Sequence, residues 1–522
     1  MDSSTRYIVR VALLVALGGF LMGFDASVIS GVVTFIEPEF NLTNIQLGWA
    51  VASLTLTATL AMMTAGPLSD RFGRRAVLKW AAMLFSVSAV ASALAPDYLT
   101  LVIARMVGGF GVGAALIIAP MYIAEISPPD KRGRMVSFNQ LNIVIGISVA
   151  FFSNYLILRF GQSGHALAQQ LGMDEWAWRW MLGVEAVPAV LYFLALFTVP
   201  ESPRWLVMHG RQDEALGVMT RASSESMAKA EMEAIQESLA VDANKKEGSL
   251  RELFQPSMKL VLIIGVSIAI LQQITGINSV FFYAPMIFEQ SGIGTDASFM
   301  QAILVGLVNL VFTVLAIMLI DRLGRKPLLG FGLAGIAFCM LLLAYGFGQA
   351  TYTLTDEALR ALPAVVDVDA LLPLAGQVFE SDVAFRQAVT AAIGAEAFSS
   401  HQSALVSSAI AMNPTLILVG ILGFVASFAI SLGPVMWVLF SEMFPNRIRG
   451  IAISFVGLIN SAVSFTVQLV FPWELENLGN SMTFLIYGLF AILGLFIVVR
   501  LLPETKGRSL EELERELIRD PS

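Results

Sequence analysis

The chain has 522 residues, of which 56% are hydrophobic and only 14% are charged. Soluble domains carry roughly 25% charged residues, so this composition excludes an ordinary soluble protein and indicates an integral membrane protein. The net charge of −8, without a basic tract, argues against a nucleic-acid partner. The single cysteine, Cys339, excludes an intrachain disulfide and a thiolate metal site.

The first predicted element is an apolar run that follows Arg6 and Arg10. It has no small-residue cleavage site, so we expect a retained helix and not a cleaved signal peptide. A helix that crosses ~30 Å of hydrocarbon needs ~20 apolar residues. The sequence therefore predicts an all-α integral membrane protein with twelve transmembrane helices, at residues 8–33, 46–66, 76–95, 99–123, 135–158, 179–199, 259–288, 297–320, 327–347, 414–440, 449–472 and 481–502.

The distribution of positive charge predicts the orientation. With both termini in the cytoplasm, the cytoplasmic segments hold 27 of the 32 lysines and arginines. This asymmetry follows the positive-inside rule and predicts a multi-pass protein of the plasma or bacterial inner membrane. Four arginines fall in outer segments and one, Arg105, falls within a span; the outer ones are Arg159, Arg179, Arg360 and Arg386.

Two longer segments interrupt the spans. Residues 201–258 are rich in Glu, Lys, Gln, Ala and Ser, and the amphipathic patterns at 213–222 and 228–240 predict a cytoplasmic helical linker, with a disordered linker as the alternative. Residues 349–413 form an acidic outer insertion in which we expect short helices. In the first outer loop, Asn41 begins a glycosylation triplet that we do not expect to be used.

A duplicated charged turn reveals an internal repeat. GPLSDRFGRR (66–75) corresponds to DRLGRK (321–326), 251 residues later. EISPPDKRG (125–133) corresponds to EMFPNRIRG (442–450), 317 residues later, and the difference in separation matches the 349–413 insertion. We therefore predict two similarly oriented six-helix halves at 1–200 and 259–502, followed by a cytoplasmic tail at 503–522; parallel repeats of this kind occur in transporters.

Further motifs complete the pattern. They are GGFLMGFDASVISG (18–31), RMVGGFGVG (105–113), PESPRWL (200–206), QQITGIN (272–278), GPVMWVLFSEMFPNRIRG (433–450) and PETKGRSLEELE (503–514). In combination the chain resembles the sugar porter family of the major facilitator superfamily, which includes proton-coupled monosaccharide transporters of the bacterial xylose and glucose type and facilitative glucose transporters. The resemblance covers all predicted helices and fails only in the 349–413 insertion.

Three charged residues lie deep inside predicted spans: Asp25, Arg105 and Glu185. A charge at the bilayer centre costs at least ~2.5–3.5 kcal/mol, so each needs a partner or a path to water. We expect Asp25 to pair with Arg105, either permanently or as a switch that takes up a proton when the arginine withdraws. The resemblance favours the switch, because an acid occupies the Asp25 position in proton symporters of the family. Glu185 assists the coupling or only bonds within its half.

Charged residues at the cytoplasmic helix ends predict a latch that closes the inner mouth, since acids there can bind helix N-termini and arginines of the opposite half. The alternative is that the arginines only anchor loops at the membrane. The predicted latch residues are Asp70, Arg71, Arg74, Arg75, Glu125, Arg132, Asp321, Arg322, Arg325, Glu442 and Arg449.

Uncharged amides at midplane depth predict a sugar site, because amides pair with sugar hydroxyls and an aromatic ring covers the sugar face. The alternative for a single amide is a bond between helices. Gly276 and Pro285 favour a broken helix within 259–288. The resemblance implies that Tyr283 is an outer gate. The predicted substrate-binding residues are Gln140, Gln272, Gln273, Asn278, Asn309, Trp437 and Asn460.

The pattern departs from a bacterial pentose-transporting sequence at Asn460 and Ser461, where Gln-Trp is expected, and at Met22, where an aromatic is common. The sequence therefore does not decide whether the transported sugar is a pentose, a hexose or inositol. We expect sugar:proton symport by alternating access, with a facilitative uniporter as the alternative and sodium coupling not excluded. A sugar sensor and a drug exporter are remote alternatives.

No nucleophile–base set or metal-ligand cluster is evident, so we expect neither an enzyme nor a cofactor or metal. The predicted partners are the monosaccharide, the proton and the lipid bilayer, and we expect a functional monomer.

Overall fold

The computed structural model describes residues 3–128, 131–244, 249–445 and 448–506. The chain divides into two compact units. The first consists of Met1–Val28, Ser53–Ala150 and Arg179–Glu247, and the second consists of Ile29–Ala52, Phe151–Trp178 and Gly248–Ser522. The second unit thus takes in residues 29–52 and 151–178, which lie in the N-terminal half of the sequence. The division into halves at 1–200 and 259–502 stays a prediction. Residues 507–522 of the predicted tail lie outside the described part of the chain.

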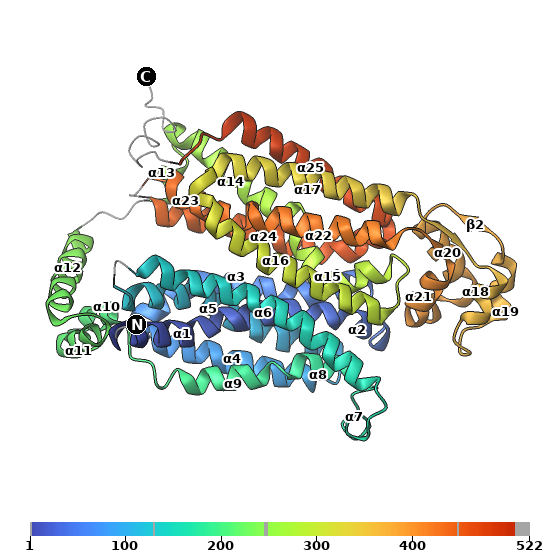
Figure 1. Cartoon of the computed structure of the whole chain (residues 1–522), viewed down its shortest axis with the longest axis horizontal. Helices are drawn as coiled ribbons and strands as arrows, with labels where there is room; N and C mark the ends of the chain where they lie inside the picture. Colours follow the sequence, from blue (N-terminus) through green and yellow to red (C-terminus); the bar gives the residue numbers. More distant parts are fainter. Residues whose placement is uncertain (1–2, 129–130, 245–248, 446–447, 507–522) are drawn as a thin grey trace. The chain divides into compact units, whose positions relative to one another are not determined.

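In the described part of the chain, eleven helical segments are long and apolar enough to cross a membrane. Each coincides with one of the predicted spans (Figure 1). Two of these segments consist of two helices each: α14 (Lys259–Ile274) with α15 (Ile277–Glu289), and α22 (Pro414–Ile430) with α23 (Leu432–Met443). Seven of the single helices are α1 (Ser3–Val28), α3 (Asn44–Phe72), α4 (Arg74–Ala93), α5 (Tyr98–Ile126), α6 (Arg132–Gly161), α16 (Thr295–Leu323) and α17 (Arg325–Gly348). The last two are α24 (Arg449–Asn477) and α25 (Gly479–Leu501).

The remaining predicted span, 179–199, is formed by two short helices, α8 (Ala177–Gly183) and α9 (Ala186–Ala195). They meet at Val184 and Glu185, where the chain forms a turn. Pro188 explains the break, because its ring nitrogen cannot donate to the carbonyl of Val184 four residues earlier and its ring clashes with that carbonyl. Neither α8 nor α9 alone is long enough to span the membrane. Glu185 lies at the break between them, near the middle of the predicted span.

The first unit is held together by close packing of long helices. Helix α5 packs against α1 and α4, and α4 packs against α9. Glycines permit these approaches: a Cβ at Gly113 would meet the backbone of Ala58, and one at Gly111 would lie 3.0 Å from the carbonyl oxygen of Ala81. Small residues are typical of such membrane helix contacts. Large buried side chains, including Phe85, fill the space between the helices.

The described residues of the segment 201–258, which leave out 245–248, are largely helical, as the amphipathic pattern predicts. It contains α10 (Pro203–Met208), α11 (Gln212–Ala222), α12 (Glu225–Asn244), α13 (Leu250–Leu253) and the 3-10 turn η2 (Pro256–Met258). Ser202 caps α10 by accepting from the backbone N–H of Trp205. Apolar side chains of α10, α11 and α12, among them Leu206, Met219 and Met232, form a small common core. This core explains why the segment is helical in spite of its polar composition.

In the second unit, α17 packs against α22 and α25, and α14 packs against α24 and α25. Helix α15 contacts α16, α24 and the 3-10 turn η1 (Ile29–Gly31) that ends the first span. A short helix, α2 (Val33–Glu39), follows η1 and contacts α15. The unit also contains α7 (Ala166–Gln170). Helix α15 therefore packs against two short elements, η1 and α2, that follow the first long helix in the sequence.

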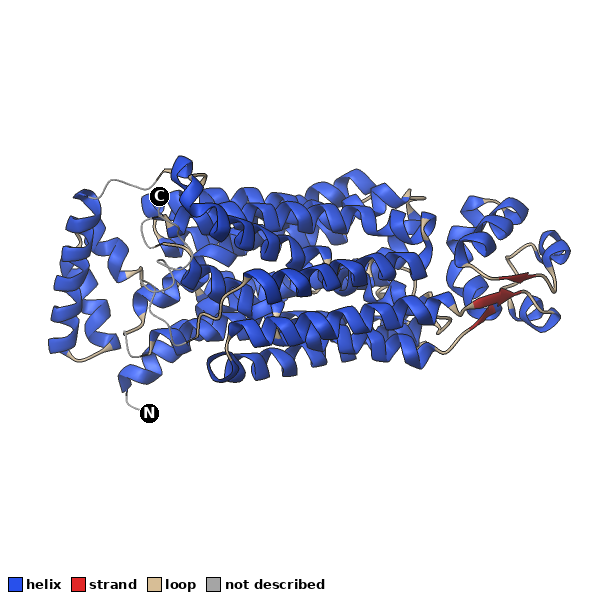
Figure 2. Cartoon of the chain, turned by 90° about the horizontal axis from the view of Figure 1, so that it is seen from above, coloured by secondary structure: helices blue, strands red, loops and turns tan. Residues whose placement is uncertain are grey.

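The insertion 349–413 forms a small folded module at the end of α17 and α22 (Figure 2). The expected short helices are present, but a sheet of three short antiparallel strands in the order β2-β1-β3 was not predicted. Tyr352 of β1 pairs with Phe379 of β2 and Ile410 of β3, and it stacks on Phe385 in the module's own core. The elements are β1 (Thr351–Thr353), α18 (Asp356–Ala361), α19 (Val368–Leu371), η3 (Leu372–Leu374), β2 (Val378–Phe379), α20 (Asp382–Ile393), α21 (Ala395–Ala409) and β3 (Ile410–Ala411).

Candidate functional site

Asp25 and Arg105 form a buried ion pair in the first unit. Nη1 of Arg105 donates to Oδ1 of Asp25 at 2.7 Å and to the backbone carbonyl of Asp25 at 3.1 Å. Both side chains are 2% exposed. A charge buried alone would be costly, and the pair offsets part of that cost. The geometry brings together the two residues that the sequence predicts as partners, on α1 and α5.

Not every polar atom of this pair is satisfied. Oδ2 of Asp25 and Nε of Arg105 are buried without a hydrogen-bond partner in the described structure. A Cβ at Gly108 would lie 2.7 Å from Oδ2 of Asp25, so only glycine leaves room for the unpaired oxygen at this position. An unpaired buried acceptor is unfavourable, and protonation would turn it into a donor. Asp25 thus holds one oxygen in the ion pair and one that can receive a proton.

Glu185 lies within electrostatic reach of this pair, where it interacts with both Asp25 and Arg105. It is 3% exposed, and its Oε1 has no partner among the described residues. The break between α8 and α9 positions this side chain. Two buried acids, Asp25 and Glu185, thus interact with one arginine, Arg105.

Helix α14 ends at the position that the sequence predicts for a broken helix. Gly276 has a φ of +90°, a left-handed conformation that favours glycine, and α15 begins at the next residue. The ring of Tyr487 lies against Gly276, so a side chain there would also clash. The break frees backbone groups and side chains at the two helix ends to bind a ligand.

Four predicted amides meet at this break and form one network. Asn460 of α24 donates to Oε1 of Gln272 at 2.8 Å, and Gln273 donates to Oδ1 of Asn460 at 3.3 Å. Asn278 donates to Oε1 of Gln273 at 2.8 Å. Gln272 also donates to the carbonyl of Leu432 at 3.1 Å, next to the break between α22 and α23. The network joins α14, α15, α23 and α24 around a cluster of uncharged donors and acceptors.

Two further members of the network, Ser464 and Gln468, were not predicted from the sequence. The hydroxyl of Ser464 accepts from Asn278 at 2.7 Å and from Gln468 at 2.8 Å. Together with Asn460 they occupy every fourth position of α24, which places them on one helix face. This spacing of polar residues in an apolar helix was the signal that could have identified them.

Tyr283, the predicted gate residue, is fully buried on α15. Its hydroxyl donates to the carbonyl of Gln468 at 3.0 Å, and its ring packs on Phe471. The backbone at Tyr283 is not helical, with φ of −124° and ψ of 16°, two residues before Pro285. Tyr283 therefore lies at a kink within α15, and its gate role stays a prediction.

The other predicted substrate residues are not joined to the network by a hydrogen bond among the described contacts. Asn309 is buried on α16, 6% exposed. Trp437 of α23 is 47% exposed and makes an edge contact with Phe440. Gln140 lies on α6 in the first unit. Their roles in sugar binding stay predictions.

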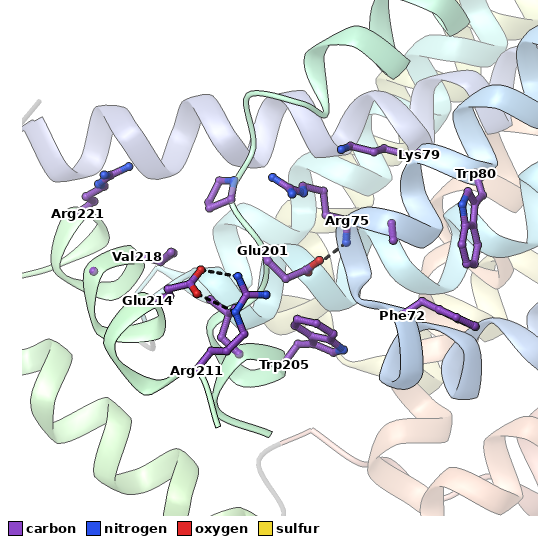
Figure 3. Close-up of a pocket in the computed structure, with 14 residues that line it drawn as sticks. Phe72, Arg75, Lys79, Trp80, Glu201, Trp205, Arg211, Glu214, Val218 and Arg221 are labelled. Carbon is purple, nitrogen blue, oxygen red and sulfur yellow. Dashed lines mark hydrogen bonds and ion pairs between the residues drawn. The ribbon is translucent and has the colours of Figure 1, made fainter. Parts of the chain in front are cut away.

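The duplicated charged turn has a defined structure in the first unit. Arg74, the first residue of α4, donates through Nε and Nη2 to the two oxygens of Glu125 at 3.0 Å and through Nη1 to Asp70 at 2.7 Å. Glu201 accepts from the backbone N–H of Arg75 at 3.1 Å, so its carboxylate caps the start of α4 (Figure 3). Ser202 donates to Glu125 at 2.5 Å and completes the cluster.

The second unit repeats these contacts residue by residue. Arg325 donates to both oxygens of Glu442 at 3.1 and 2.6 Å and lies 3.2 Å from Asp321. Glu504 accepts from the backbone N–H groups of Arg325 and Lys326, each at 3.0 Å. Thr505 donates to Glu442 at 2.6 Å, as Ser202 does to Glu125. The repeat seen in the sequence is thus a repeat of hydrogen bonds.

The remaining predicted latch residues bond locally. Arg132 donates to the carbonyl of Ala124 at 2.9 Å and lies 3.5 Å from Glu231. Arg449 donates to the carbonyl of Phe444 at 3.1 Å. The guanidinium of Arg71 lies over the ring of Phe72, and the carbonyl of Arg322 accepts from Lys506. Each of these contacts joins residues of the same unit, so a latch between the halves stays a prediction.

A polar pocket of about 590 Å³ adjoins the turn in the first unit (Figure 3). Arg75, Lys79, Arg211 and Arg221 line it together with Glu201 and Glu214, and Arg211 is paired with Glu214. Its lining residues come from the end of α3, from α4, and from the segment 200–221 that contains α10 and α11. No cluster of three or more metal-ligating side chains occurs within residues 3–128, 131–244, 249–445 and 448–506.

Comparison with known proteins gives consistent relatives. The sequence matches the family described as sugar (and other) transporters over residues 11–365 and 385–517. It is 34% identical to the arabinose-proton symporter of Bacillus subtilis over 98% of this chain and 95% of that protein. It is 36% identical to the D-xylose-proton symporter of Escherichia coli over 98% of this chain and 96% of that protein.

Solved structures give the same result. The structure matches the inward-open xylose transporter XylE of E. coli with a TM-score of 0.74 and 34% identity, covering 97% of this chain and 99% of that chain. A partially occluded form of the same transporter gives a TM-score of 0.72. The likeness therefore extends over almost the full length of the compared chains.

Proposed function

This chain belongs to the sugar transporter family, a family of membrane transporters and not of enzymes, and we propose that it carries a monosaccharide together with a proton by alternating access. The fold is the all-α, twelve-helix fold of the major facilitator superfamily with two six-helix halves. The relatives with 34% and 36% identity bear the names of arabinose-proton and D-xylose-proton symporters. These names support a monosaccharide as the transported substrate and a proton as the coupled ion.

The buried pair of Asp25 and Arg105 is the observation that carries the proton coupling. In the paired state Asp25 is ionised and its charge is matched by Arg105. A proton that binds to the free Oδ2 neutralises the carboxylate and removes the attraction that holds the guanidinium. The arginine is then free to change partner, and Glu185 is the acid within its electrostatic reach. Proton binding and a rearrangement of α1 against α5 are linked in this way.

The amide network supplies the sugar site. Without a ligand, hydrogen bonds join the side chains of Gln272, Gln273, Asn278 and Asn460 to one another. The hydroxyls of a sugar can replace these hydrogen bonds, so no amide is left unpaired when the sugar binds. Ser464 joins the site because it shares Asn278 with Gln273. Gln140, Asn309 and Trp437 complete it in the proposal, and Tyr283 gates it.

The proposal places the protein in the cell membrane, as a monomer with both termini in the cytoplasm. The repeated clusters around Glu125 and Glu442 then lie on the cytoplasmic side and act as the latch. The pentoses D-xylose and L-arabinose are the first sugars to test, followed by D-glucose and inositol. A facilitator with the same sugar site is the alternative, since the amide network would serve either mode.

Uptake of labelled sugar into cells that express the protein separates these alternatives. A symporter accumulates the sugar above the external concentration, and an uncoupler that collapses the proton gradient abolishes the accumulation. Uptake that reaches only the external concentration and is indifferent to the uncoupler would establish the facilitator. Cells with an empty vector provide the baseline.

A further inference from the structure

A second pocket lies in the second unit, at the end of α15 opposite the Gly276 break. It has a volume of about 260 Å³, which is close to the lower end of the roughly 300–1,000 Å³ of small-molecule sites. Four elements line it: α2, the end of α15 with Gln290 that follows it, the start of α16 at Thr295, and α21 of the insertion. Thr34, Glu289 and Gln290 are among the residues that line it.

Gln290 is the strongest sign that this pocket binds a ligand. Its side chain is 5% exposed, and neither its amide nitrogen nor its amide oxygen has a hydrogen-bond partner in the described structure. Oε1 of Glu289 and the hydroxyl of Thr34 are also buried without partners. Buried polar groups are nearly always paired, so three such residues around one pocket need an explanation. A polar ligand that fills the pocket would satisfy them together.

The chemistry of the lining favours a polyhydroxylated ligand over a cation. A cation would use the carboxylate and carbonyl oxygens and leave the amide N–H groups of Gln290 unsatisfied. A sugar hydroxyl both donates and accepts, so neighbouring hydroxyls can bond to the two ends of one amide. Ser399, Ser400 and Ser403 add further hydroxyls, while Phe35 and Met286 offer apolar surface for the ring. Within the described residues no third carboxylate, histidine or cysteine completes a metal site.

The pocket is connected to the amide network through one helix. Asn278 and Glu289 both lie on α15, about 16 Å apart along the axis at 1.5 Å per residue. The kink at Tyr283 lies between them. A ligand in the pocket would bridge α2 and α21 to the end of α15 and thereby bias the direction of the half-helix that carries Tyr283.

We propose that this pocket is a second monosaccharide-binding site, to which the insertion 349–413 contributes α21. The inference rests on the proposed function, since it takes its ligand from the class of sugar that the protein transports. It gives the insertion a role: the module supplies serine hydroxyls and closes one side of the pocket.

Hydrogen–deuterium exchange of the full-length protein in nanodiscs tests the proposal. D-xylose, L-arabinose and D-glucose are added up to ten times the concentration that half-saturates sugar counterflow. We expect amide exchange in peptides of α21 to slow at least threefold with the transported sugar. Gln290→Ala should lose this protection while it still exchanges sugar in counterflow, and Ser403→Ala should weaken it. The control is Gln387→Ala, an exposed glutamine of α20 outside the pocket, which should keep the protection.

Each other outcome has a defined meaning. Protection of α21 that survives Gln290→Ala, or a wild type that exchanges sugar without protecting α21, overturns the second site and leaves the transport function intact. Protection produced by sodium chloride and not by choline chloride, without sugar, overturns it in favour of a cation site. A wild type that exchanges none of the sugars contradicts the transport function itself and removes the premise.

Discussion

At the scale of single residues, Asp25 presents two oxygens with different surroundings. Oδ1 is bonded to Arg105, while Oδ2 is buried and free beside Gly108. The sequence predicts the pair, because a lone charge within a span is costly. It could not predict the free oxygen, which depends on the packing of α1 against α5. This oxygen is what makes the pair suitable for proton coupling as well as for structure.

Asp25→Asn tests that role. The amide cannot ionise, so the protein should still exchange labelled for unlabelled sugar in counterflow but should lose accumulation against a gradient. Counterflow and proton-driven uptake in proteoliposomes measure the two activities separately. Asp97→Asn, which alters the N-cap of α5 outside the pair, serves as the control. Accumulation by Asp25→Asn at the wild-type level would contradict the coupling role.

Glu37, on α2 outside the spans, gives a prediction about pH. Burial raises the pKa of its carboxyl from 4.5 to about 7; Arg386 opposes this shift and Glu476 adds to it. Glu289 is the other acid that interacts with Glu37. The folded protein therefore holds this proton more tightly than the unfolded chain, so its contribution to stability is complete below pH 4.5 and is lost as the pH rises to about 7.

Thermal unfolding between pH 4.5 and 8 measures this effect. The melting temperature of the wild type should fall with pH by an amount that Glu37→Gln lacks, because the amide does not titrate. Glu380→Gln, an exposed acid on the insertion, should retain the wild-type slope. If Glu37→Gln and the wild type show equal slopes, burial of this carboxyl has no effect on stability.

At the scale of elements, proline and glycine determine where the spans break. The break at Gly276 was predicted from its sequence position, and the one between α8 and α9 was not, although Pro188 is visible in the sequence. Length and apolar composition predict the spans well, because the bilayer fixes both. The sheet in the insertion was missed because its strands are only two or three residues long and show no periodicity.

Gly276→Ala should destabilise the protein. A left-handed conformation costs a residue with a Cβ about 1–2 kcal/mol, and the ring of Tyr487 must also move. The affinity for sugar should fall too, because Gln273 and Asn278 flank the break. Gly330→Ala is the matched control: this glycine lies within α17 with open space around its Cβ position, and alanine favours helix. Equal melting temperatures for the two variants would contradict the account.

At the scale of the whole molecule, the repeat relates the two halves. The contacts of Arg74, Glu125 and Glu201 recur as those of Arg325, Glu442 and Glu504. Gly73 and Gly324 both have positive φ, and a Cβ at either would meet the capping glutamate. The sequence reveals the duplication, but the hydrogen bonds of Glu201 and Glu504 to the helix starts required the structure.

The proposed latch predicts that Asp70→Asn shifts the protein toward its inward-facing state, because the variant removes a charge from the cluster around Arg74. A cysteine at the exposed Ser441, in a Cys339→Ser background, should then react faster with a polar maleimide. Asp213→Asn, an exposed acid of α11, should leave the reaction rate unchanged. An unaltered rate in Asp70→Asn would reject the latch.

Sugar-driven proton uptake in proteoliposomes tests the central claim most directly. The purified protein is reconstituted with a pH-sensitive dye inside, without a membrane potential, and D-xylose, L-arabinose, D-glucose or inositol is added outside. The account predicts that the transported sugar acidifies the lumen, and that Asp25→Asn abolishes the acidification while it still exchanges that sugar. Sugar entry without any proton movement in the wild type would contradict symport and establish a facilitator.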